Sequence, residues 1–297
     1  QTFWARNAKR LAKAGLCYLP PFTNNKHSAL AFSLLAEAGV DTLMYGYSKP
    51  ETPEAIWAPL WETIEQTRCD KILVSSEEFM RIGAHPRAAD ALERVTAPWR
   101  GKLSIRPLIY LRDPAEHLPS WYNQLVKMGQ MVPDYGRAVS EIMEDVHYDY
   151  LQALEPWQRI FGADALILRP YHSGVRSGKA LMKDAMQAMD VKVWLGNPLW
   201  QFRNVSSNQR LDDRMLELRR VLTLIRAPEN YATRVMQRTA NVFEREETLI
   251  RREAEAFAEI ADRSRASKFG MTSRRANNLV PEPLSKSPAS SALAVPT

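Results

Sequence analysis

The chain has 297 residues, of which 45% are hydrophobic and 25% charged, and its formal net charge is +6. A chain of this size and composition can bury the core of one large domain or of two small ones. No stretch approaches the ~20 apolar residues that a membrane-spanning helix needs, so we expect no membrane span. The positive net charge is compatible with an anionic ligand or with nucleic acid.

Cysteine and histidine are both sparse. The two cysteines, Cys17 and Cys69, offer neither a disulfide framework nor a metal-ligand spacing. We therefore expect small buried thiols in a reducing compartment, the cytoplasm. The five histidines are scattered without any i, i+4 pair. This pattern argues against a metal enzyme, and we expect no metal in the site.

The first segment, residues 1–14, has apolar residues near the helical period and is followed by Gly15, a plausible C-cap. Nothing precedes this helix that can serve as an N-cap, and the chain begins with Gln1 instead of methionine. We interpret this start as the loss or cleavage of an upstream part. Residues 17–29 then have the pattern of a loop, and residues 27–38 that of a second helix, which Gly39 closes.

Strand and helix patterns alternate along the next part of the chain. A short apolar run at residues 40–47 precedes a helix in which Thr52 is the N-cap and Pro53 the first helical residue. Buried-strand patterns then occur at residues 71–75, 103–111 and 163–171, and helical patterns at residues 113–129, 136–162, 177–191 and 208–225. This alternation predicts right-handed crossovers and a mostly parallel sheet with helices on both faces, a three-layer α/β/α fold.

The composition changes toward the C-terminus. Residues 1–226 form the predicted α/β domain, and residues 227–269 a charge-rich helical extension of the same domain. Residues 270–297 are rich in Pro, Ser and Ala, so we expect a disordered tail. The arginines of the C-terminal third alternate with glutamates at helical spacing, which is more typical of a solvated helix face than of a nucleic-acid patch. We expect no nucleic-acid partner.

Polar residues follow the predicted strands at the edge where open parallel sheets bind their ligands. Arg112 comes directly after a strand, with Asp113 as N-cap of the next helix and Glu116 completing a capping box. Free backbone N–H groups beside a guanidinium form a phosphate site. Ser120 adds a possible donor two turns into the helix, and Pro119 loosens the helix there. A simple salt bridge at the strand end is the alternative for this arginine.

Two other strand ends carry polar groups. Ser75 ends the strand at 71–75 and is followed by Ser76, Glu77 and Glu78, and Arg169 and Tyr171 end the strand at 163–171. A carboxylate at the rim of a cleft suits a general base, whose pKa can be raised by burial. The alternative is that one or both glutamates simply point to water.

Together these residues resemble the sulfotransferase family, specifically bacterial sulfotransferase-like proteins with a P-loop NTPase-like, nucleotide-kinase-like fold. The most specific match is "LIYLRDPAEHLPSWYNQLVKMG" at residues 108–129. The other matching segments are "ILVSSEEF", "LILRPY" and "FRNVSSNQRLDDRMLELRR". The resemblance spans roughly residues 1–226.

The resemblance implies a sulfuryl donor, 3′-phosphoadenosine 5′-phosphosulfate (PAPS), and a hydroxyl or amine acceptor on a small molecule or carbohydrate. It implies that Arg112 and Ser120 hold the 3′-phosphate and that Glu77 takes the acceptor's proton, with Glu78 as the less favoured neighbour. Family members open with a strand and a glycine-rich, lysine-containing loop around the 5′-phosphosulfate. This chain begins with "QTFWARN", as though cut just after that loop. We therefore expect a missing N-terminal strand and an inactive fragment.

Other functions stay open on the sequence. The chain can be a non-catalytic module that binds an anionic nucleotide or a sulfated glycan. A small-molecule kinase is disfavoured because no "GKS" or "GKT" occurs, and DNA binding is disfavoured because no recognised motif appears. Tryptophans are candidates for a carbohydrate site or for the core: Trp57, Trp61, Trp121, Trp157, Trp194 and Trp200. The sequence does not predict the oligomeric state.

Overall fold

A computed structural model describes residues 1–19, 26–41, 43, 51–176, 178–193, 195–196, 199–202 and 210–273, with side chains up to residue 259. The chain divides into two compact units, Gln1–Ala227 and Pro228–Thr297. Most of the apolar run at 40–47, Trp194, residues 203–209 and the tail beyond residue 273 lie outside the described residues.

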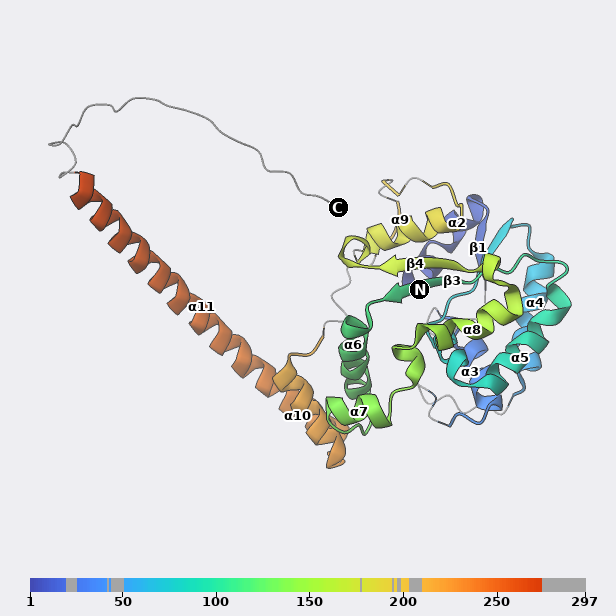
Figure 1. The fold of residues 1–297 in the computed structure, drawn as a ribbon, viewed down its shortest axis with the longest axis horizontal. Coiled ribbons are helices and arrows are strands. Elements are labelled where there is room, and N and C mark those ends of the chain that lie inside the picture. The colour runs from blue at the N-terminus through green and yellow to red at the C-terminus, as the bar shows by residue number, and fades with distance from the viewer. Residues whose placement is uncertain are drawn as a thin grey trace, which may run out of the picture. The chain divides into compact units, whose positions relative to one another are not determined.

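The first unit alternates helices with short strands (Figure 1). Its α-helices are α1 (Thr2–Arg6), α2 (Ala8–Lys13), α3 (Ser28–Glu37), α4 (Pro53–Gln66), α5 (Pro86–Thr96), α6 (Pro114–Lys127), α7 (Tyr135–Glu141), α8 (Tyr150–Phe161), α9 (Gly178–Ala188) and α10 (Asp213–Leu224). The strands are β1 (Leu16–Tyr18), β2 (Lys71–Leu73), β3 (Leu108–Arg112) and β4 (Ile167–Tyr171). The 3₁₀ helices are η2 (Glu78–Ala84), η3 (Ala97–Trp99), η4 (Asp145–His147), η5 (Ala163–Ala165) and η6 (Ser173–Val175).

The strands pair in parallel, as the alternation of strands and helices predicts. β1 pairs with β2, with Leu16 opposite Lys71. β3 pairs with β4, with Arg112 opposite Tyr171. Among the described residues the strands form two separate two-stranded sheets. The fold class is therefore mixed α/β with parallel strands.

Helices cover both faces of β2. Ile72 packs into a core formed mainly by α3, α4, α5 and α8, around Leu34, Leu60 and Leu92. Leu73, the next residue, packs into a second core with side chains of α1, α2 and α9. Successive side chains of a strand point to opposite faces, so β2 separates the two cores.

The tryptophans mostly contribute to packing. Trp57, Trp61 and Trp157 belong to the first core, where Trp61 also stacks on Trp99 with ring centroids 4.8 Å apart. Trp200 packs against Phe3 in the second core. Among the described residues, packing in the core therefore accounts for these tryptophans better than a carbohydrate site does.

Two local expectations were wrong. The predicted loop at 17–29 overlaps β1, whose residues are all buried; a strand this short carries too little periodicity to be recognised. The predicted single helix at 1–14 breaks at Asn7, which is buried. The Asn7 amide donates to the carbonyls of Phe3, at 2.9 Å, and Gln201, at 3.1 Å, so a long-range contact takes precedence over helix continuity.

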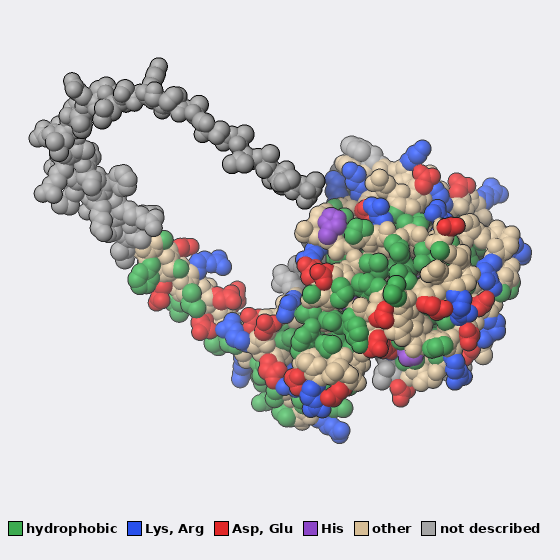
Figure 2. Space-filling view, viewed as in Figure 1, with side chains coloured by type: hydrophobic (Ala, Val, Ile, Leu, Met, Phe, Trp, Pro, Cys, Tyr) green, Lys and Arg blue, Asp and Glu red, His purple; other side chains and the backbone are tan. Residues whose placement is uncertain are grey.

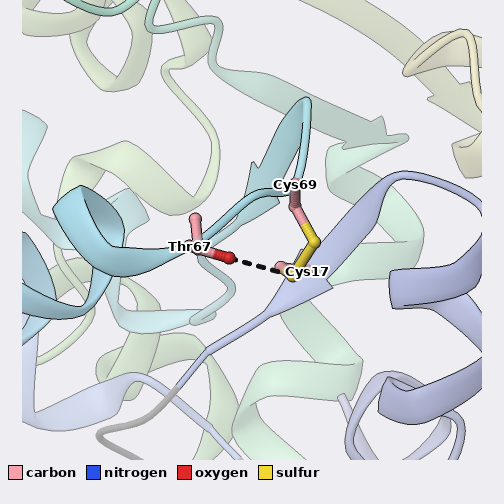
Figure 3. The surroundings of a disulfide bond; sticks show 3 residues. All are labelled: Cys17, Thr67 and Cys69. Carbon is pink, nitrogen blue, oxygen red and sulfur yellow. Dashed lines mark hydrogen bonds between the residues drawn. A yellow bond between two sulfur atoms is a disulfide. The ribbon is translucent and has the colours of Figure 1, made fainter.

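The cysteines correct a third expectation. Cys17 of β1 and Cys69, just before β2, form a disulfide with Cα atoms 5.8 Å apart (Figure 3). The hydroxyl of Thr67 lies 3.4 Å from the Cys17 sulfur. The two residues are 52 positions apart in sequence, and the parallel pairing of β1 with β2 brings them together. They are a covalent link between two strands instead of free buried thiols.

The second unit contains α11 (Glu229–Ser273), a single helix over the predicted charge-rich segment. Figure 2 shows cationic and anionic side chains interspersed along it, the pattern typical of a solvated helix face. Several of its apolar side chains are also exposed, namely Val242, Leu249, Ile250 and Phe257. In the part of the chain that the structure describes, no helix is long and apolar enough to cross a membrane.

Candidate functional site

Arg112 lies at the predicted turn between β3 and α6. Asp113 caps α6, because its carboxylate accepts a hydrogen bond of 2.8 Å from the backbone N–H of Ala115. The hydroxyl of Tyr150 donates to the Arg112 carbonyl and so ties this turn to α8. The strand, the cap and the helix are confirmed, and together they fix the backbone from which the Arg112 side chain extends.

Glu116 does not complete the expected capping box. Its carboxylate accepts instead from two guanidinium groups, that of Arg112 at 3.3 Å and that of Arg176, which follows η6. Both arginines contact the same oxygen, Oε2. The ordinary salt bridge considered for Arg112 is therefore present, and it gathers a second arginine that the sequence analysis did not single out.

Ser120 is exposed on α6, and its hydroxyl makes no hydrogen bond with other described residues. It lies four residues after Glu116, which in turn lies four residues after Arg112. Positions four apart share one face of a helix, so Ser120 extends the face that carries the arginine contacts. Pro119 stands inside α6 and removes one backbone donor from its first turns. Arg112 at the end of β3 and Ser120 on α6 thus belong to one strand-turn-helix segment.

Glu77 follows β2 and immediately precedes η2. Its side chain is 72% exposed and forms an ion pair of 3.2 Å with Lys26. The serines before it have structural partners. Ser75 donates its backbone N–H to Nδ1 of the fully buried His27 at 3.0 Å, and Ser76 contacts the hydroxyl of Ser28 at 3.4 Å. These bonds fasten the start of η2 to the start of α3.

Glu78 has a very different environment from Glu77. It is only 4% exposed, and its carboxyl makes no hydrogen bond or ion pair with the described residues. Burial raises its pKa to about 7, an effect that nearby Arg81 partly opposes and nearby Glu77 reinforces. Of the two adjacent glutamates, Glu78 has the near-neutral pKa and Glu77 has the access to solvent.

A buried polar cluster extends from Glu78 into the interior; we define it as Glu78, Arg81, His85, Glu144, His117 and His147. The Arg81 guanidinium donates to both oxygens of Glu144, at 2.6 and 2.9 Å, and His85 Nε2 lies 2.9 Å from the same carboxylate. Burial alone would raise the pKa of Glu144, but the hydrogen bonds from His85 and Arg81 outweigh it and lower the pKa to about 2. The Glu144 carboxylate is therefore held ionised.

Two histidines form the other part of the cluster. Nε2 of His117 lies 3.0 Å from Nδ1 of His147, and Trp121 stacks on His147 with ring centroids 4.6 Å apart. Burial lowers the pKa of His147 to about 3, and burial together with the charge of Arg112 lowers the pKa of His117. Burial therefore favours the neutral form of both rings. No local signal in the sequence predicts this pair, because its members are 30 residues apart on different elements.

The cluster connects the two predicted parts of the site electrostatically. The charge of Arg112 acts on His117, and Arg81 and Glu144 act on both His147 and Glu78. Among the described residues, no group of acidic, histidine and cysteine side chains is arranged to hold a metal ion. At the third strand end, the Arg169 guanidinium forms an ion pair with Asp184 of α9, which holds it in a structural contact.

The pH dependence of stability tests the cluster. Between pH 4.5 and 7 the Glu78 carboxyl stays protonated when folded but ionises when unfolded, so its contribution to the unfolding free energy falls as pH rises. His147 acts oppositely: its contribution is present above pH 6.5 and is lost as pH falls toward 3. Glu78→Gln removes the falling contribution of Glu78. Between pH 4.5 and 7 we therefore expect the unfolding free energy of this variant to rise more steeply with pH than that of the unmodified chain, by about 1.4 kcal/mol per pH unit.

Urea unfolding of both proteins between pH 4.5 and 8 measures this difference in slope. His117 shifts in the same direction as His147 in both proteins and so cancels in the comparison. Parallel stability curves for Glu78→Gln and the unmodified chain would show that Glu78 is ionised in the folded protein.

No protein-family model, no curated protein and no solved structure matches the chain. The function is therefore argued from the geometry of Arg112, Ser120 and the two glutamates.

Proposed function

We propose that the chain is a sulfotransferase, which moves a sulfuryl group from PAPS to a hydroxyl or amine of a small-molecule or carbohydrate acceptor. The observation that carries the proposal is the position of Arg112, at the turn from a parallel strand into the capped N-terminus of α6. Backbone N–H groups at a helix start and an arginine fork are a suitable combination of donors for a phosphate. In PAPS the 3′-phosphate is the group that would occupy this position.

The available donors support this assignment. An arginine has five N–H groups, and in the described part of the chain Arg112 uses only Nε, toward Glu116. Its two terminal nitrogens can therefore bind phosphate oxygens in the two-point geometry that a guanidinium favours. Ser120, on the same helix face, adds a hydroxyl donor. Arg112 and Ser120 would hold the donor by its 3′-phosphate and orient the distant sulfuryl group.

The proposed reaction is an in-line displacement at sulfur. The acceptor oxygen or nitrogen forms a bond to sulfur while the bond from sulfur to the phosphate oxygen breaks, and adenosine 3′,5′-bisphosphate leaves. A base takes the acceptor's proton. We assign this role to Glu77, because its carboxylate reaches solvent while that of Glu78 is buried. Positioning and charge stabilisation would supply most of the rate enhancement, as in phosphoryl transfer.

We also propose that the two small sheets belong to one parallel sheet of a three-layer, P-loop NTPase-like fold. In support, Leu73 of β2 and Leu108 and Tyr110 of β3 pack into the same core, against α1, α2 and α9.

A transfer assay tests the proposal. The protein, together with any residues that its gene encodes upstream of Gln1, would receive PAPS with radiolabelled sulfate and a panel of hydroxyl and amine acceptors. We expect acceptor labelling, and Arg112→Ala should lower kcat/KM at least about 100-fold, because it removes two charge-assisted hydrogen bonds to the donor. Arg137→Ala, which removes an exposed arginine paired with Glu141, is the matched control and should leave the rate unchanged.

An alternative function is a non-catalytic module that binds an anionic nucleotide or a sulfated glycan. One observation favours it: the Glu77 carboxylate is already paired with Lys26 through Oε2, so one of its two oxygens is engaged. The same assay separates the two functions. Binding of adenosine 3′,5′-bisphosphate that depends on Arg112, without labelling of any acceptor, would favour the module.

A further inference from the structure

We infer that Arg176 is a second phosphate-binding arginine and that Glu116 is an exchangeable counter-ion, which holds both guanidinium groups until a phosphate dianion replaces it. This inference rests on the proposed function and names two residues of the same site. Arg112 ends β3 and Arg176 follows η6, which comes directly after β4 and His172. The parallel pairing of β3 with β4 sets Arg112 opposite Tyr171, and this register brings the two segments together.

The contact geometry carries the inference. Arg112 Nε and Arg176 Nη2 both donate to a single oxygen, Oε2 of Glu116. The two guanidinium groups thus share one carboxylate, while the other carboxylate at this helix start, that of Asp113, accepts from the backbone N–H of Ala115. The helix dipole adds a positive potential at the N-terminus of α6. A phosphate monoester carries nearly two negative charges near neutral pH and balances the two guanidinium groups better than the carboxylate does.

The number of free N–H donors also supports a phosphate ligand at Arg112 and Arg176. Beyond their bonds to Glu116, the guanidinium groups of Arg112 and Arg176 make no other hydrogen bond with the described residues. Most of their N–H groups are therefore available. A carboxylate offers two oxygens, whereas a terminal phosphate offers three, so a phosphate can satisfy more of these donors at once.

The Glu116 contacts are also weak enough to exchange. The Arg176 and Glu116 side chains are 41% and 47% exposed. Ion pairs between exposed side chains contribute little to stability and are screened by salt. Glu116 can therefore swing toward solvent when a stronger anion arrives. The arrangement would favour a 3′-phosphorylated nucleotide over one with a free 3′-hydroxyl, because only the former brings an anion that can replace the carboxylate.

Calorimetric titration of the full chain with adenosine 3′,5′-bisphosphate and with adenosine 5′-monophosphate tests the inference. We expect the unmodified chain to prefer the bisphosphate. Arg176→Ala should weaken bisphosphate binding about 10-fold or more and leave monophosphate binding unchanged. Glu116→Gln removes the competing charge and should strengthen bisphosphate binding several-fold. Arg137→Ala is the matched control, and circular dichroism melting establishes that each variant is folded.

The outcomes separate the inference from the proposed function. If the bisphosphate is preferred and Arg112→Ala abolishes the preference, but Arg176→Ala and Glu116→Gln change nothing, the inference is wrong and the proposed function stands. An equal loss of affinity for both nucleotides in Arg176→Ala also overturns the inference. If the unmodified chain binds neither nucleotide, or binds both equally, the phosphate site itself is wrong and both proposals fail.

Discussion

Replacing Glu144 by glutamine is expected to lower the free energy of unfolding by about 3 to 5 kcal/mol. Arg81 is only 8% exposed, and its guanidinium donates to both Glu144 oxygens. A glutamine keeps the size of the side chain but removes the charge that compensates the buried arginine. His85 loses its carboxylate partner at the same time. The cost is therefore that of a buried charge left without its counter-ion, which exceeds the cost of a lost surface pair.

Urea unfolding followed by circular dichroism measures this loss. Glu141→Gln is the matched control, because Glu141 pairs with Arg137 on the surface and its replacement should change stability by less than about 0.5 kcal/mol. A second variant, Arg81→Met combined with Glu144→Gln, removes both charges and should recover much of the stability. A single Glu144→Gln variant as stable as the control would mean that water compensates Arg81.

Removing the Cys17–Cys69 disulfide is expected to have a comparable effect. In the chain-entropy account, a cross-link over 52 residues stabilises the folded state by roughly 4 kcal/mol, because it restricts the unfolded chain. β1 is short and pairs with β2 over only a few residues, so the β1–β2 pair depends strongly on this link. We expect the double variant Cys17→Ser, Cys69→Ser to unfold at a clearly lower urea concentration.

Dithiothreitol supplies the control for this prediction. It should lower the urea midpoint of the unmodified chain and leave that of the double serine variant unchanged. Thiol alkylation of the denatured, unreduced chain followed by mass spectrometry shows independently whether the disulfide forms. Full labelling of both cysteines would show that the disulfide does not form, and equal stability of the two proteins would show that it does not contribute.

The elements around the candidate site show where sequence reasoning succeeds. The strand that ends at Arg112, the Asp113 cap and the helix that carries Ser120 were predicted correctly, because they form one continuous segment whose signals are local. The binding roles of Arg112 and Ser120 stay a prediction. The resemblance favoured Glu77 over Glu78, but no local signal distinguishes the two residues, since they have the same chemistry and differ only in surroundings. Packing against α3, α8 and η4 buries one and leaves the other in solvent.

The sequence by itself determined the elements whose signals lie within a few residues. Thr52 and Asp113 cap their helices through hydrogen bonds to N–H groups two or three positions ahead, and Gly15 and Gly39 follow helices with φ of +81° and +88°, where other residues are strained. The alternation of strands and helices likewise predicted parallel pairing, because a strand followed by a helix returns in the same direction.

Only the tertiary structure decided which distant side chains meet. Cys17 with Cys69, His117 with His147, Arg81 with Glu144, and Arg112 with Arg176 across Glu116 are all separated by at least 30 residues in sequence. Periodicity reports which face of an element is buried, but not which element covers it. Packing selects those partners, and the charge and pKa of each group in the site then follow from burial and from the neighbours that packing supplies.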